Sequence, residues 1–266
     1  MAFQRYDLKT FQFEWAGLEN FRQIFYNLSL PGDILLVSLL NSLKLYAANL
    51  LVGTSLALLF SYYIYKKYKG SEFFRVVLFL PSIISSVVMV TMFRFFTDRG
   101  IPDMSKLCFG IKIEGFLTNV NTRFGTILFY NIWVGFGTSI LMYVSAMTRI
   151  PPEITESANL DGASDIREFF SITLHSIYST ITAFLIIGVS GIFTSQGAIY
   201  EFYGRYLSDT SLSTLGYYLF QYVQNSDGFN NYASASAAGL LGTFISAPIV
   251  LFFRWLLDKF DPMAEV

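Results

Sequence analysis

The chain reads Pro151-Pro152-Glu153-Ile154-Thr155-Glu156-Ser157-Ala158-Asn159-Leu160-Asp161-Gly162-Ala163-Ser164 between two long apolar segments. Proline suits the first turn of a helix, where amide protons have no internal partner. Two glutamates follow near the positive end of the helix dipole, and glycine is typical just past a helix C-terminus. The stretch therefore predicts a short helix over 153–160 that ends at Gly162. A second short helix is expected from Asp165, leading back towards the membrane.

Spacing divides the predicted helix into two sides. The apolar side is expected to carry Ile154, Ala158 and Leu160. The polar residues Glu153, Glu156 and Asn159 are expected to point elsewhere. Such a helix can lie in the membrane interface and merely connect two spans. Small side chains at Ser157 and Ala158, with a backbone break at Gly162, instead favour close approach by a partner, so we interpret the helix as a docking element.

The composition is that of a membrane protein. Of the 266 residues, 53% are hydrophobic and only 14% are charged, against about a quarter charged in soluble domains. The net charge of −1 gives no reason to expect nucleic acid. A single cysteine (Cys108) and a single histidine (His175) exclude an intramolecular disulfide framework and a His-rich metal centre. Walker A, GxSxG and HExxH patterns are absent, so no catalytic or metal-binding residues are assigned.

Five segments have the roughly 20 mostly apolar residues that a transmembrane helix needs. They lie within Ile34–Tyr65 and at about Phe73–Phe96, Phe124–Met147, Ile177–Tyr200 and Ser234–Leu257. This predicts an all-α polytopic fold with an N-terminal extracytoplasmic or interfacial segment (1–32), a transmembrane core (33–260) that contains the 150–175 loop, and a C-terminal tail (261–266).

Basic residues in short loops indicate which side faces the cytoplasm. They gather in three places: Lys66, Lys67, Lys69 and Arg75; Arg149 and Arg167; Arg254 and Lys259. These places fall on one side, which we predict to be cytoplasmic, and the N-terminus then lies outside. Either the five-span core inserts in that orientation, or a first span that precedes it is missing from this sequence.

Features inside the spans bear on transport. Pro81 is expected to kink the second span, and the small residues Ser234, Ala238 and Gly242 favour close packing of the fifth. Lys44 and Arg94 lie near the outer ends of their spans, and no carboxylate lies well inside a span, which argues against an ion-coupled transporter. The uncharged polar and aromatic residues that suit a neutral sugar are Tyr130, Asn131, Trp133, Ser190, Thr194 and Gln196. The alternative is that the aromatic residues form interfacial belts and the amides bond across helices.

The 150–174 stretch resembles the "EAA" loop of permease subunits in the carbohydrate-uptake branch of bacterial ABC importers, the maltose-type binding-protein-dependent family. A glutamate, two small residues, a glycine and then Ile172-x-Leu174 fall on motif positions. Further similar segments, in order, are Gly17-Leu18-Glu19-Asn20-Phe21, Asn41-Ser42-Leu43, Phe74-Arg75 before Leu80-Pro81, Trp133-x-Gly135-Phe136, and Thr214-Leu215 to Leu219-Phe220. Ser157 replaces the first alanine of the motif, and His175 replaces the usual proline, so the fourth span is expected to begin less sharply.

The resemblance implies a type I ABC importer permease fold with about five transmembrane helices and a cytoplasmic coupling helix. The loop residues that it assigns to ATPase coupling are Glu156, Ser157, Ala158, Asp161, Gly162 and Ala163. It also implies two ABC ATPase subunits that bind ATP and magnesium, a second permease that forms a heterodimer with this chain, an extracellular solute-binding protein and a sugar substrate. The chain itself would bind no cofactor and would lie among the lipids of a bacterial cytoplasmic membrane. The segment 17–21 follows the first helix in such importers, which favours a chain that lacks that helix.

Two rival functions stay open on the sequence alone. One is an importer for another polar solute, such as an amino acid or a glycerol-phosphate compound, although an anionic solute would favour cations in the spans. The other is a membrane scaffold that transports nothing. An intramembrane enzyme is disfavoured, because the chain offers no nucleophile–base pair.

Overall fold

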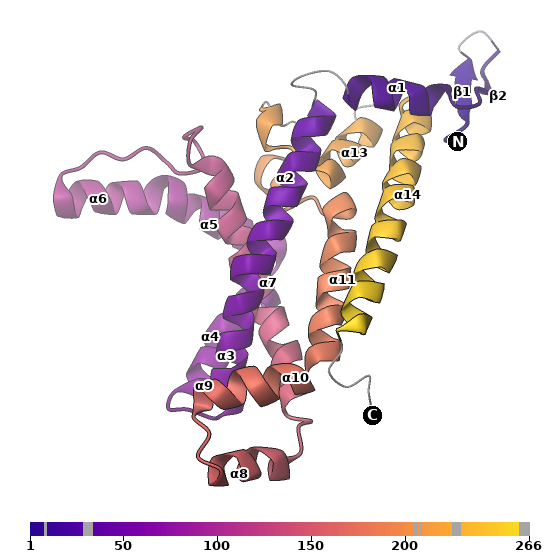
Figure 1. Ribbon diagram of the computed structural model, residues 1–266. Coiled ribbons are helices and arrows are strands. Elements are labelled where there is room, and N and C mark those ends of the chain that lie inside the picture. Colours follow the sequence, from indigo (N-terminus) through magenta and orange to yellow (C-terminus); the bar gives the residue numbers. More distant parts are fainter. Residues whose placement is uncertain (8–9, 29–33, 205–206, 208, 225–229, 261–266) are drawn as a thin grey trace. The chain divides into compact units, whose positions relative to one another are not determined.

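The computed structural model describes residues 1–7, 10–28, 34–204, 207, 209–224 and 230–260, and most of them are helical (Figure 1). This confirms the predicted all-α class, apart from one small hairpin near the N-terminus. The chain divides into two compact units, each assembled from three stretches. Unit one comprises Met1–Tyr46, Phe93–Leu128 and Val189–Val250, and unit two comprises Ala47–Met92, Phe129–Gly188 and Leu251–Val266. The predicted tail 261–266 lies outside the described residues.

Unit one begins with an antiparallel β-hairpin and a short helix. These elements are β1 (Gln4–Asp7), β2 (Gln12–Trp15) and α1 (Glu19–Leu28). Tyr6 lies opposite Phe13 with ring centroids 5.1 Å apart, a cross-strand aromatic pair of the kind that stabilises hairpins. The Asn20 amide on α1 donates to the carbonyl oxygens of Ala2 at 2.9 Å and Gln4 at 3.0 Å. The helix is thereby tied to the hairpin.

Buried polar side chains join distant parts of unit one. Its other helical elements are the first part of α2 (Ile34–Ala48), the end of α5 (Ser86–Phe95), η2 (Phe96–Gly100), α6 (Ile101–Phe109), the start of α7 (Arg123–Met147), the end of α11 (Tyr178–Thr194), α12 (Ile199–Tyr203), η4 (Thr210–Leu212), α13 (Leu215–Gln224) and most of α14 (Asn230–Lys259). The Asn41 amide on α2 donates to the carbonyls of Ser211 at 2.7 Å and Ser213 at 3.0 Å. Ser42 accepts from the Leu215 amide at 2.9 Å. Two segments that carry the family resemblance, 41–43 and 214–215, are therefore in direct contact.

Unit two is built around α7 and the helices beside it. Its elements are the end of α2, η1 (Asn49–Thr54), α3 (Ser55–Tyr65), α4 (Ser71–Ile83), the start of α5, most of α7, α8 (Pro152–Leu160), α9 (Asp165–Glu168), η3 (Phe169–Thr173), α10 (Leu174–Ser176), most of α11 and the end of α14. The buried core joins α3, α7 and η3 through Tyr62, Phe136, Ile140, Tyr143, Met147 and Phe169. Ser61 donates to the Ile140 carbonyl at 3.2 Å, which pairs α3 with α7 inside this core.

Glycine allows α7 to lie directly against α4. A Cβ atom at Gly137 would lie 2.5 Å from the Leu78 carbonyl oxygen and 2.9 Å from the Phe79 Cα. Contacts that short do not occur, so any side chain at this position would force the two helices apart. Small residues serve this purpose widely between membrane helices.

Three described helices are long and apolar enough to cross a membrane, and up to five spans result if each of two bent pairs counts as one. The single helices are Ile34–Tyr65, Arg123–Met147 and Tyr232–Lys259, which agrees with the first, third and fifth predicted spans. The second predicted span, 73–96, is bent, as expected of a span that contains Pro81. Its two limbs, Ser71–Ile83 and Ser86–Phe109, meet at 104°. Ile84 is extended, three residues beyond Pro81, which removes one hydrogen-bond donor from the end of α4.

Candidate functional site

The polar stretch of the 150–175 loop forms the predicted short helix. Helix α8 runs from Pro152 to Leu160, one residue longer than expected at its start. Gly162 has φ +75°, a left-handed conformation that glycine adopts without strain. Its amide donates to the Asn159 carbonyl at 3.1 Å, and the Ala163 amide donates to the Ala158 carbonyl at 3.0 Å. This is the Schellman pattern of helix termination, and it confirms the predicted stop at Gly162.

The second predicted helix also begins at Asp165. The Ser164 hydroxyl accepts from the Arg167 amide at 3.4 Å, so serine caps the start of α9. From there the chain remains helical through η3 and α10 to Ser176.

The chain bends where the fourth span begins, although His175 stands in place of the usual proline. The limbs Asp165–Ser176 and Tyr178–Thr194 meet at 70°. Ile177 ends α10 with φ −102° and ψ 13°, and its carbonyl accepts from the Thr180 amide at 2.9 Å. The His175 ring nitrogen Nδ1 lies 3.1 Å from the Phe170 carbonyl oxygen. The bend therefore forms at Ile177, two residues after His175, through main-chain bonds that need no proline.

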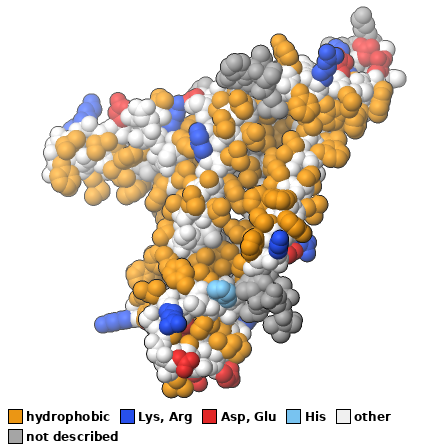
Figure 2. Space-filling model, viewed as in Figure 1, with side chains coloured by type: hydrophobic (Ala, Val, Ile, Leu, Met, Phe, Trp, Pro, Cys, Tyr) orange, Lys and Arg blue, Asp and Glu red, His pale blue; other side chains and the backbone are white. Residues whose placement is uncertain are grey.

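Helix α8 carries an open hollow on one side. Its lining residues are Glu153, Ile154, Ser157, Ala158, Asp161 and Ile172. Ala158 is the buried residue of α8, and the coupling candidates Glu156, Ser157, Asp161 and Gly162 are exposed, while Ala163 is half-buried. Figure 2 shows acidic side chains beside apolar ones at this end of the molecule. The small side chain of Ala158 lies at the floor of the hollow, and acidic and apolar side chains form its rim. A protein surface can dock on such a hollow.

Leu160 does not share a side with Ala158, contrary to the prediction. Its side chain is 89% exposed. Two helical steps turn the chain by about 200°, which places residue 160 opposite residue 158. Ile154, four residues before Ala158, does lie on the same side and lines the hollow. Exposed apolar side chains continue beyond α8 at Ile166 (73%) and Phe170 (58%).

A buried ion pair fixes the loop to the end of α3. Lys66 Nζ lies 2.7 Å from Glu168 Oε2, and the Glu168 side chain is fully buried. The Tyr68 hydroxyl donates to the Asp165 carboxylate, and this bond raises the pKa of Tyr68 to about 12, so the phenol remains a donor at neutral pH. Lys66 is predicted from sequence only as a basic residue that indicates orientation. Its contact with Glu168 has no signal in the sequence, because the two residues lie 102 positions apart.

The six candidate substrate residues fall into two groups of three. Tyr130, Asn131 and Trp133 lie on α7 in unit two, and Ser190, Thr194 and Gln196 lie on α11 and the turn after it in unit one. Ser190 and Thr194 are exposed, and Asn131, Trp133 and Gln196 are half-buried. Tyr130 is only 3% exposed, so its ring has little surface left for a solute.

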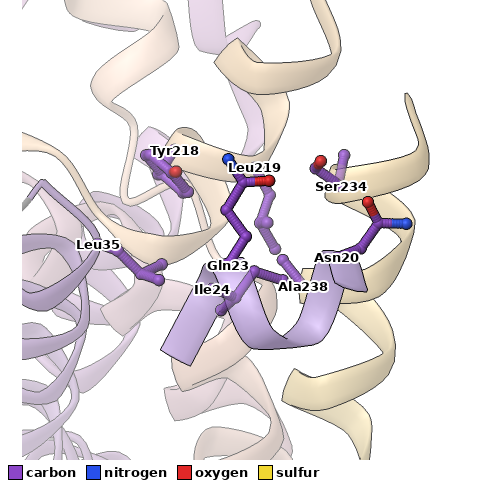
Figure 3. A pocket seen from close by; sticks show the side chains of 9 residues that line it. Asn20, Gln23, Ile24, Leu35, Tyr218, Leu219, Ser234 and Ala238 are labelled. Atoms are coloured by element: carbon purple, nitrogen blue, oxygen red, sulfur yellow. The ribbon is translucent and has the colours of Figure 1, made fainter. Parts of the chain in front are cut away.

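A small cavity in unit one is not a solute site (Figure 3). It lies among α1, α2, α13 and α14, where Gln23 and Ile24 face Tyr218 and the small residue Ala238. Its volume is about 30 Å³. Because a liquid water molecule occupies about 30 Å³, the cavity has room for about one or two waters and not for a sugar. Among the described residues, no three His, Cys, Asp or Glu side chains gather where they could hold a metal ion.

These elements define a polytopic α-helical membrane protein that presents a short, glycine-terminated helix outside its apolar spans. A family model described as "Binding-protein-dependent transport system inner membrane component" matches residues 49–265, and the chain belongs to this family. It is 31% identical to the probable ABC transporter permease protein YesP of Bacillus subtilis (strain 168), over 95% of this chain and 81% of the relative. It is 26% identical to the multiple sugar-binding transport system permease protein MsmF of Streptococcus mutans, over 94% and 83%.

A solved structure supports the same fold. A chain of a bacterial ABC transporter involved in the import of the acidic polysaccharide alginate superposes with a TM-score of 0.77. The match covers 92% of this chain and 84% of that chain at 24% sequence identity. The predicted permease fold is thereby confirmed.

Proposed function

We propose that this chain is one membrane subunit of an ATP-driven importer in a bacterial cytoplasmic membrane. It would move a sugar or oligosaccharide that an extracellular solute-binding protein delivers. Two ATPase subunits, which bind ATP and magnesium, would drive the motion, and a second permease would complete the pathway. The chain itself would bind no nucleotide and catalyse no reaction.

One observation carries the proposal for ATPase coupling. In a chain of this family, α8 ends in a left-handed glycine beside an open hollow with Ala158 at its floor. A helix that only connects two spans gains nothing from such a hollow. We therefore assign the contact with the ATPase to Glu156, Ser157, Ala158, Asp161, Gly162 and Ala163.

The sugar is proposed from two kinds of support. MsmF is named for a multiple sugar-binding transport system, and the superposed structure imports a polysaccharide. The half-buried or exposed candidates Asn131, Trp133, Ser190, Thr194 and Gln196 offer amides, hydroxyls and an aromatic face. Sugars have hydrogen-bonding rims and apolar ring faces that these groups match.

The test is Gly162→Asp in the complete complex, reconstituted in liposomes with its ATPases, second permease and binding protein. Radiolabelled neutral and uronic trisaccharides serve as probes of uptake. Open space surrounds Gly162, so an added side chain meets no atom of this chain and projects towards a partner. We expect uptake to be lost while the variant still inserts at the normal level.

Gly110→Asp is the matched control. Gly110 follows α6 with φ +68°, and open space surrounds it as well. The local backbone strain is therefore similar, at about 1–2 kcal/mol or less, but the residue lies far from the loop in sequence. Unchanged uptake in Gly162→Asp would contradict ATPase coupling through this loop. If the unaltered complex takes up none of the probes, the proposal that it imports a sugar is contradicted.

A further inference from the structure

The docking helix has few means of passing a displacement directly to its own unit. Ala158 is the buried residue of α8, and the acidic and apolar side chains around it are largely exposed. The segment that follows Gly162 is different, because Glu168, Phe169 and Thr173 are all buried there. One route for a load on α8 therefore runs through the turn at 161–164 into α9 and η3, beside those through the buried Ile150 and through the Thr155–Tyr65 contact.

The segment 165–169 is held by the last turn of α3 and the residues just after it. Tyr62 donates to the Asp165 carbonyl at 3.0 Å, and its ring packs against Phe169 with centroids 4.9 Å apart. Lys66 bonds Glu168 at 2.7 Å, and Tyr68 donates to the Asp165 carboxylate. Figure 1 shows α9 beside the end of α3, in agreement with these contacts.

The Lys66–Glu168 pair is the most constrained of these contacts. Glu168 has no exposed side-chain surface, and its second oxygen, Oε1, has no hydrogen-bond partner. Its charge is therefore compensated chiefly by one ammonium group, which is 17% exposed. A buried charge with one strong partner is costly to separate from it, so the two residues move together. Lys66 also caps α3, where a cation is favoured by the helix dipole.

We propose that the Lys66–Glu168 pair is a positioning contact that transmits displacement of α8 to the end of α3. The contacts of Tyr62 and Tyr68 orient the segment 165–169, and the Lys66–Glu168 ion pair holds this segment against the end of α3. This inference rests on the proposed ATPase coupling, since it concerns what happens after α8 is pushed. Docking of the ATPase on α8 is separate from this contact, because neither Lys66 nor Glu168 lines the hollow.

The experiment compares Lys66→Met with Arg254→Met in the complete reconstituted complex. Arg254 forms an exposed pair with Asp258 in the same unit at 3.7 Å, so this control also removes one cation, with one ion pair where Lys66 has two, to Glu168 and to Asp165. The readout is trisaccharide moved per ATP hydrolysed, together with the amount of ATPase that copurifies. We expect Lys66→Met to retain the ATPase but lower the transport-to-hydrolysis ratio by about tenfold, and Arg254→Met to change neither quantity.

Two double variants separate transmission from folding. Lys66→Met/Glu168→Met removes both charges and restores thermal stability, since no unpaired charge stays buried. Its transport-to-hydrolysis ratio should remain low. If the Lys66–Glu168 pair only stabilised the fold, the double variant would recover both the thermal stability and the ratio. The exchanged pair Lys66→Glu/Glu168→Lys should recover the ratio relative to either single variant.

The movement of α9 relative to the end of α3 can also be measured directly, without any solute. Spin labels are placed on the exposed positions 69 and 167 through Lys69→Cys and Arg167→Cys in a Cys108→Ser background. With Lys66 present, the distance between the labels should be the same without nucleotide and with ATP and vanadate. With Lys66→Met the two distances should differ.

The outcomes are distinct for the two proposals. A normal ratio and an unchanged label distance in Lys66→Met would overturn the transmission role and leave the importer intact. Loss of copurified ATPase would also overturn it, by making the pair part of docking. A complex that moves no probe even without substitutions would instead contradict the proposed function.

Discussion

Ser157 is the residue at which the loop departs from the family's first alanine, and it lines the hollow on α8. Ser157→Ala should leave ATPase binding unchanged, because both side chains are small. Ser157→Arg should weaken binding by about tenfold or more, since forcing a long side chain into a packed contact costs about 1–3 kcal/mol. Titration of the purified membrane subunits with the ATPase subunit measures this affinity.

Asn159→Arg is the control for that change. Asn159 is exposed on the same helix and does not line the hollow. It should bind the ATPase as the unaltered chain does. If both arginine variants bind equally well or equally poorly, the hollow is not the contact surface.

Local chemistry explains which residues of the loop are predictable from sequence. Pro151, Pro152 and Gly162 act on their own backbone, and the ends of α8 follow them to within one residue. Glu168 is different, because its burial depends on Lys66, which lies 102 positions earlier in the chain. A contact of that separation has no periodic signal in the sequence.

At the scale of helices, the close contact between α7 and α4 depends on one glycine. Gly137→Ala should destabilise the protein by about 1–3 kcal/mol, because its Cβ would meet the Leu78 carbonyl oxygen at 2.5 Å and push α4 away from α7. The loss is measurable as a lower thermal midpoint of the detergent-solubilised protein.

Gly135→Ala is the matched control on the same helix. No atom lies within 4 Å of a Cβ at that position. Alanine also has a higher helix propensity than glycine, so Gly135→Ala should be neutral or slightly stabilising. Equal destabilisation by both alanines would mean that helix flexibility, and not the contact with α4, decides the effect.

Helix breaks are the part of the fold that hydropathy cannot reveal. A window over residues 73–96 is apolar on average, yet the chain turns by 104° beyond Ile83. Pro81 indicates a weakened helix, but the turn comes three residues later, at the extended Ile84. The bend at Ile177 occurs without any proline. Average hydropathy predicts that a segment is apolar, and packing decides whether it remains straight.

Over the whole molecule, the segments of the family resemblance acquire a structural meaning. In unit one, Asn41 and Ser42 bond the chain at 211–215, which lies about 170 positions further along the sequence. In unit two, Gly137 meets the backbone of 78–79. These residues directly adjoin the resemblance segments 133–136 and 80–81. Weak sequence similarities, taken in order, therefore mark pairs of segments that pack together and not isolated positions.

The orientation of the chain in the membrane is also a property of the whole molecule. The basic residues of the 66–75 link, the 150–175 loop and the C-terminal end should face the cytoplasm, because translocation of short basic loops is disfavoured. Cys108 on α6 is exposed and falls in the loop predicted to lie outside. A membrane-impermeant maleimide should therefore label Cys108 in intact spheroplasts. In the Cys108→Ser/Arg167→Cys variant it should label only after permeabilisation. The opposite pattern would place α8 outside, where no ATPase could reach it, and would remove the basis for coupling through Gly162.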